Sequence, residues 1–215
     1  MDVDLDGAYD VVSSQEQHAE QVTVFWGPTN KNQLLQPKAW KESKFKAVSG
    51  VSMWMFAQPI HLKPDRPIDL VIGGKNYAKD QSAWLGLLLA PVTNRHDAAA
   101  WTWKPLTHVS WTMSIEVLDL NGDGNDDILF SDKHGPAHRC LVAGKSGNDA
   151  PQNSEWKRYA LTKPGWEGCN FLTVGDLDGD GLQDVVALLD GTRQPARRIM
   201  LIGGFCSSAG WTKPD

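Results

Sequence analysis

Three nine-residue windows share one acidic pattern, and their recurrence constrains the fold more than any other feature of this chain. They cover residues 2–10, 119–127 and 176–184 (the first, second and third acidic loops), and each fits D-x-[DN]-x-D-G-x-x-D. With Asp and Gly each at roughly 5 to 7% of residues, a chance match is expected well under once per ten thousand start positions. Three matches in 215 residues therefore indicate a motif with a shared chemical purpose.

The pattern is that of a calcium loop. Side chains at positions 1, 3 and 5 point into one concavity, Gly at position 6 permits a sharp turn, the carbonyl of position 7 turns inward, and the carboxylate at position 9 closes the cage. Hard, charged oxygen ligands suit Ca²⁺ better than Zn²⁺ or copper, so about three ions are expected, one per loop. The expected ligands are Asp2, Asp4, Asp6, Ala8 and Asp10; Asp119, Asn121, Asp123, Asn125 and Asp127; and Asp176, Asp178, Asp180, Leu182 and Asp184.

An EF-hand is excluded, because it requires Glu at position 12 and flanking helices. Position 12 is instead Ser13, Phe130 or Ala187. An apolar run with the character of a strand follows each loop directly: Val11–Val12, Ile128–Phe130 and Val185–Ala187.

The last Asp of each loop marks a repeat. Asp10, Asp69, Asp127 and Asp184 are separated by 59, 58 and 57 residues, and a step near 58 indicates repeated structural units. Further apolar runs recur between each of these residues and a later Trp: Val22–Trp26, Trp84–Leu89, Cys140–Ala143 and Ile199–Ile202.

Four short strands per unit, with no amphipathic helix, are typical of a β-propeller blade. We therefore expect an all-β chain: a partial propeller of about four four-stranded blades in a single domain. The repeats cover approximately residues 1–50, 51–108, 109–166 and 167–215. The second unit has His61 and Lys63 where carboxylates belong, so no calcium is expected there.

These features resemble the FG-GAP or VCBS repeats of integrin-α-like propellers, and the resemblance covers essentially the whole chain. The segments Trp54–Ala57, Trp111–Ser114 and Ile128–Asp132 are also similar to an uncharacterised group of exported bacterial repeat proteins. The resemblance implies calcium binding, an extracytoplasmic or secreted location, and adhesion or carbohydrate binding. It also implies that each calcium loop joins the first two strands of a blade.

The ends and the cysteines leave alternatives open. Asp2 is already a ligand position, so we expect truncation at the N-terminus of a longer exported propeller whose signal peptide is not in this chain; the alternative is a closed four-bladed cytosolic ring beginning at Met1. Cys140, Cys169 and Cys206 are odd in number and lack metal-site spacing. Buried thiols are expected, and one disulfide remains open if the protein is exported.

Charge and hydropathy restrict the partners. A net charge of −5 argues against nucleic acid, and the longest apolar stretch, residues 83–90, is far shorter than the roughly 20 residues of a membrane span. The turns opposite the acidic loops carry bases, so an anionic glycan or cell-surface ligand is expected there; the alternative is solvated turn charge. The candidate ligand-binding residues are Lys75, Lys133, His134, Trp54 and Trp111, and for the two tryptophans the alternative is blade core.

No nucleophile constellation or P-loop is present in the sequence, and no catalytic residue is assigned. A binding or scaffold role is therefore expected rather than catalysis. The alternative is a domain of a polysaccharide-degrading enzyme, either a lyase or a hydrolase.

Overall fold

The computed structural model describes residues 1–16, 20–62, 68–76, 82–120, 124–134, 140–145, 156–161, 169–189 and 198–202. For residues 140–145, 157–160, 169, 189 and 198–202 it describes the backbone alone.

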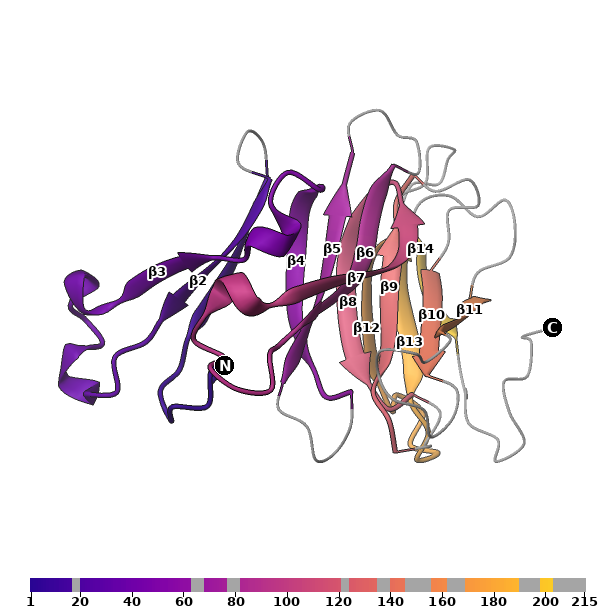
Figure 1. Ribbon diagram of the computed structural model, residues 1–215. Coiled ribbons are helices and arrows are strands. Elements are labelled where there is room, and N and C mark those ends of the chain that lie inside the picture. The colour runs from indigo at the N-terminus through magenta and orange to yellow at the C-terminus, as the bar shows by residue number, and fades with distance from the viewer. Residues whose placement is uncertain are drawn as a thin grey trace.

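Strands dominate the described part of the chain and form four antiparallel sheets, which confirms the all-β class (Figure 1). The first sheet contains β1 (Val11–Gln15), β2 (Gln21–Trp26) and β3 (Lys41–Lys44). The second contains β4 (Met53–Ile60), β5 (Asp69–Lys75), β6 (Ala83–Leu89) and β7 (Thr102–Val109). The third contains β8 (Thr112–Leu118), β9 (Asp127–Asp132), β10 (Cys140–Lys145) and β11 (Trp156–Ala160), and the fourth β12 (Cys169–Gly175), β13 (Asp184–Leu189) and β14 (Arg198–Ile202). Four single 3₁₀ turns are also described: η1 (Lys31–Gln33), η2 (Pro37–Ala39), η3 (Lys46–Val48) and η4 (Ala98–Ala100).

The predicted strands are confirmed where the sequence placed them. The run after each acidic loop forms β1, β9 or β13, and the later apolar runs form β2, β6, β10 and β14. Each strand pairs with the next along the chain, so every sheet is a simple meander. In the described chain no element is an α-helix, and no helix is long and apolar enough to cross a lipid bilayer.

The acidic loops close hairpins in one common register. Leu118 pairs with Asp127 across the second acidic loop, and Gly175 pairs with Asp184 across the third. At the first loop the Asp10 amide donates to the Met1 carbonyl at 2.6 Å. The predicted position of each loop, between two antiparallel strands, is therefore confirmed for the second and third loops.

The sheets pack against one another in chain order, with β1 on β4, β4 on β8 and β8 on β12. Figure 1 shows the first sheet at one end of this stack. Leu70 and Ile72 of β5 belong to the core between the first two sheets, whereas Val71 belongs to the core shared by the second and third. A Cβ on Gly73 would lie 2.7 Å from the Thr112 side chain, so glycine is what allows β5 and β8 to approach.

Candidate metal centres

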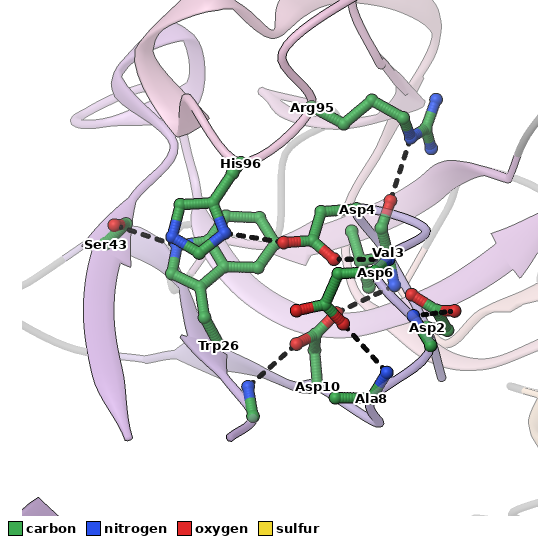
Figure 2. Close-up of polar contacts among 12 residues, drawn as sticks. Asp2, Val3, Asp4, Asp6, Ala8, Asp10, Trp26, Ser43, Arg95 and His96 are labelled. Atoms are coloured by element: carbon green, nitrogen blue, oxygen red, sulfur yellow. Dashed lines mark hydrogen bonds and ion pairs between the residues drawn. The ribbon is translucent and has the colours of Figure 1, made fainter. Parts of the chain in front are cut away.

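The first acidic loop folds around its own carboxylates (Figure 2). The Gly7 amide donates to Asp2 Oδ2 at 3.0 Å, and the Asp6 amide donates to Asp4 Oδ1 at 3.2 Å. Carboxylate oxygens of Asp2, Asp4 and Asp10 all lie within 4.8 Å of one another. Three acidic groups from one short segment are thus held around a common point.

The third acidic loop repeats this hydrogen-bond pattern position by position. In the third loop the Gly181 amide donates to Asp176 Oδ2 at 3.0 Å and the Asp180 amide donates to Asp178 Oδ1 at 3.1 Å. The matching bonds between positions 7 and 5 are Ala8 N to Asp6 Oδ1 at 2.7 Å and Leu182 N to Asp180 Oδ1 at 2.8 Å. In the second loop the Gly124 amide donates to Asp119 Oδ2 at 2.8 Å. The first and third loops therefore share one conformation, and the described part of the second loop shares their bond from position 6 to position 1.

Glycine at position 6 has a backbone reason. Gly7, Gly124 and Gly181 have φ values of 88°, 82° and 86°, in the left-handed region that disfavours side chains. Position 4 also has positive φ in two of the loops, at Gly179 (81°) and at Leu5 (67°). The first loop therefore holds a non-glycine residue where the third has glycine.

The aspartate at position 9 links its loop to the neighbouring strands. Asp10 is 4% exposed; its Oδ2 accepts from the Val3 amide and its Oδ1 from the Gly27 amide, both at 2.8 Å. Burial raises the pKa of Asp10, the charges of Asp4 and Asp6 raise it further, and the two amide hydrogen bonds oppose the rise. A bound cation would offset this accumulated negative charge.

The same bond to position 2 recurs in the other loops. The Leu120 amide donates to Asp127 Oδ2 at 3.1 Å, and the Leu177 amide donates to Asp184 Oδ2 at 2.9 Å. The third-loop carboxylates that converge within 4.8 Å are those of Asp176, Asp178 and Asp180. The two clusters of carboxylates thus differ in their third member. In the first loop it is the aspartate at position 9, and in the third loop it is the aspartate at position 5.

One oxygen in the first loop tests whether these residues fit a cation. Asp2 Oδ1 is buried and has no hydrogen-bond partner among the described residues. A buried carboxylate oxygen without a partner costs free energy, and a calcium ion would supply the missing interaction. The donors in the first loop are hard oxygens, as Ca²⁺ requires.

Two functional neighbours of the first loop come from the segment between β6 and β7, and sequence reasoning missed both. His96 Nδ1 lies 2.5 Å from Asp4 Oδ2, and the imidazole stacks on Trp26 with ring centroids 4.5 Å apart (Figure 2). The buried Arg95 guanidinium donates to the Val3 carbonyl at 2.9 Å and also to the Ile68 carbonyl. The second sheet therefore holds the first acidic loop in place.

In the second unit, His61 occupies position 1. Its amide donates to Asp126 Oδ2 at 2.8 Å, and its Nδ1 lies 3.8 Å from the same oxygen. The second unit therefore contacts the second acidic loop, which belongs to the third unit, through His61.

Three of the predicted ligand-binding residues gather around Trp111. Lys75 Nζ lies 4.4 Å and Lys133 Nζ 5.8 Å from the indole centroid, and the His134 ring lies edge-on at 5.3 Å. Lys75, however, is 4% exposed, and its ammonium pairs with the Glu16 carboxylate. The expectation of an outward-facing base at Lys75 is therefore wrong.

Trp54 also requires a correction. Its side chain is 0% exposed, and its Nε1 donates to the Val48 carbonyl at 2.9 Å. Trp54 lies in the core between the first two sheets and packs edge-on against Trp103. The expectation that Trp54 binds a ligand is therefore wrong, and the alternative, a place in the core, is correct. Its indole is not available at the surface.

Some predictions lie outside the described residues, namely the ligands Asn121 and Asp123 and the thiol of Cys206. Cys140 and Cys169 begin β10 and β12.

No protein-family model matches the chain, and no curated protein matches it. The functional argument therefore depends on the arrangement of the residues in the structure.

Proposed function

We propose that this chain is a calcium-stabilised β-propeller module of the FG-GAP/VCBS type, with a binding or scaffold role outside the cytoplasm. One observation carries the proposal: the acidic loops repeat the same backbone-to-carboxylate hydrogen bonds at the same positions. Such bonds fix the carboxylates in place before any ion arrives, which lowers the cost of ordering them on binding.

Calcium is the favoured ion because of the donor set. Three carboxylates converge in each of the first and third loops, and Asp2 Oδ1 is buried without a hydrogen-bond partner among the described residues. In the first loop, Asp2, Asp4 and Asp10 would hold the ion. Its positive charge would offset both the burial of the Asp10 carboxylate and its repulsion by Asp4 and Asp6, which together raise the pKa of Asp10.

The propeller architecture is supported by the repeated unit. Two complete four-stranded meanders, β4–β7 and β8–β11, follow each other at the 58-residue step between Asp69 and Asp127. Each contacts the next sheet through its first strand, as β4 contacts β8 and β8 contacts β12. Repetition of that packing is how blades are arranged around an axis.

The ligand-binding part of the proposal now centres on Trp111. Lys133 and His134 are both partly exposed and lie beside this indole, whereas the Lys75 charge is buried against Glu16. A partly exposed ammonium and an imidazole beside an indole suit an anionic sugar such as a uronate or a sulfated residue.

A panel of immobilised acidic polysaccharides tests this role. We expect retention that weakens with salt, loss of retention in Lys133→Ala, and no change in the matched variant Lys38→Ala, whose side chain is exposed on η2. Release of shortened or unsaturated products would instead identify a polysaccharide-degrading enzyme. Equal retention of Lys133→Ala and the unaltered protein would contradict the proposed ligand position.

A further inference from the structure

The segment that joins β6 to β7 belongs to the second unit, yet it contacts the acidic loop of the first unit (Figure 2). Arg95 donates to the Val3 carbonyl at 2.9 Å. His96 Nδ1 lies 2.5 Å from Asp4 Oδ2. Val3 and Asp4 are adjacent in the chain, and Asp4 is an expected calcium ligand. The second unit therefore contacts the loop at a ligand and at the residue before it.

Arg95 fixes the backbone from which His96 projects. The Arg95 side chain is buried and donates to the carbonyls of Val3 and Ile68. The Arg95 carbonyl accepts from Trp101 Nε1 at 2.9 Å, and its guanidinium lies 5.2 Å from the centroid of the same indole. His96 is therefore presented to the acidic loop from an anchored position.

The imidazole of His96 is also held in orientation. It stacks on Trp26 of the first unit, with ring centroids 4.5 Å apart and 25° between the ring planes. Trp26 is itself buried, and its Nε1 donates to Ser43 Oγ at 3.0 Å. An ionised carboxylate can only accept, so in the contact with Asp4 the hydrogen is on His96 Nδ1. His96 is thus a fixed donor directed at Asp4.

The two oxygens of Asp4 accept from different parts of the chain. The Asp6 amide, inside the loop, donates to Oδ1 at 3.2 Å, whereas His96 donates to Oδ2 from outside the loop. Between these donors the Asp4 side chain is only 4% exposed. A carboxylate that is already held does not have to be ordered when a cation arrives, so the entropic cost of binding is lower.

We propose that His96 is a positioning residue for the first acidic loop, a role that rests on the proposed calcium binding there. Through His96, the second unit strengthens calcium binding by the first unit. Coupling of this kind is reciprocal, so bound calcium strengthens the contact between the two units by the same free energy. Calcium in the first loop therefore stabilises a junction between units as well as the loop itself.

Three histidine variants test this role. His96→Ala removes the donor from a half-exposed position, and His96→Asn keeps an N–H donor on a δ atom. His108→Ala is the matched control: His108 is also exposed and also stacks on a tryptophan, Trp84, but in the described part of the chain it forms no hydrogen bond or ion pair with an acidic residue. Isothermal titration measures calcium binding, and urea unfolding in calcium and in chelator measures stability.

We expect His96→Ala to bind one of about three calcium ions roughly tenfold to a hundredfold more weakly and the other two as before. His96→Asn should recover most of the lost affinity, and His108→Ala should bind calcium like the unaltered protein. A residue that only supports the fold would lower stability equally in calcium and in chelator. Because His96 positions a ligand, its removal should cost more stability in calcium than in chelator.

Unchanged calcium affinities in His96→Ala, or an equal loss of stability in both conditions, would overturn the positioning role and leave the calcium sites in place. Tighter calcium binding by His96→Ala would overturn it as well, because His96 would then compete with the ion for Asp4. Absence of saturable calcium binding by the unaltered protein would contradict the proposed function itself, and the role of His96 with it.

Discussion

Asp69 holds the same place in the second sheet that Asp10 holds in the first. Asp10 Oδ1 accepts from the Gly27 amide at 2.8 Å, and Asp69 Oδ1 accepts from the Ala90 amide at 2.7 Å. Gly27 and Ala90 are the first residues after β2 and β6. Asp69 keeps this bond although His61 replaces the acid at position 1 of its unit. The aspartate at position 9 therefore has a structural role that does not depend on a metal ion.

This separation of roles predicts two kinds of aspartate variant. Asp69→Ala should lower the free energy of unfolding by about 2 kcal/mol, equally in calcium and in chelator, because it leaves the buried Ala90 amide without its acceptor. Asp180→Asn, at an exposed position of the third loop, should lower stability only when calcium is present. Urea unfolding in both conditions measures the difference, and a calcium-dependent cost for Asp69→Ala would contradict the structural role.

The left-handed backbone conformation of Gly181 predicts that a side chain there lowers stability through backbone strain and not through a steric clash. Gly181→Ala should cost roughly 1 to 2 kcal/mol, because φ is 86° although a Cβ would meet nothing within 4 Å. Gly175→Ala is the matched control, since a Cβ there also meets nothing and its φ lies outside the left-handed region. Thermal unfolding compares them, and equal melting temperatures for the two variants would refute the argument.

Burial of Lys75 predicts a structural consequence for a residue expected to bind ligand. Lys75→Ala should lower the free energy of unfolding by about 1 to 2 kcal/mol, because the side chain packs on Trp111 and pairs with the partly exposed Glu16. The exposed Lys38→Ala should have almost no effect. Chemical denaturation measures both costs, and a Lys75→Ala protein as stable as Lys38→Ala would contradict the buried placement.

Asp132 predicts a pH dependence with a definite sign. Burial raises the pKa of this carboxyl above its ordinary value, although amides of Ser110 and Trp111 donate to it and His134 opposes the rise. The folded protein thus binds this proton more tightly than the unfolded chain, so ionisation of Asp132 reduces stability as pH rises from about 4, near the unfolded pKa, through the raised folded pKa.

Asp132→Asn removes this ionisation and keeps one acceptor oxygen. Relative to the unaltered protein, the variant should therefore gain stability between about pH 4 and about pH 7. Urea unfolding in chelator at both pH values measures this difference without a contribution from bound calcium. A difference that is constant with pH, or that changes in the opposite direction, would show that Asp132 is not held with a raised pKa.

Local patterns in the sequence predicted the strands and the sharp turn at the glycine of position 6 correctly. The apolar run after each closing aspartate forms a strand, because alternating side chains there can be buried between two sheets. The hydrogen bonds of the acidic loops join residues two to seven positions apart, so the motif alone contains both partners.

Contacts between segments far apart in the chain could not be predicted from local sequence patterns. His96 and Asp4 are 92 residues apart, and His96 lies in a segment with no motif of its own. The local sequence around Lys75 does not indicate its burial, because its partner Glu16 is 59 residues away in the preceding unit. Glu16, Lys75 and Lys133 are separated by steps of 59 and 58 residues, so they hold corresponding positions in successive units. This repeat is the feature of the sequence that could have predicted that they lie close together.

Calcium stoichiometry tests the central claim most directly. Isothermal titration of the chelator-treated protein with CaCl₂ should show about three bound ions per chain, one for each acidic loop. The Asp180→Asn variant, altered at position 5, which is Asp in all three loops, should bind about one ion fewer and otherwise keep the same binding isotherm, because the other two loops are unchanged. Absence of saturable calcium binding, or a stoichiometry that Asp180→Asn leaves unaltered, would contradict the assignment of these loops as calcium sites.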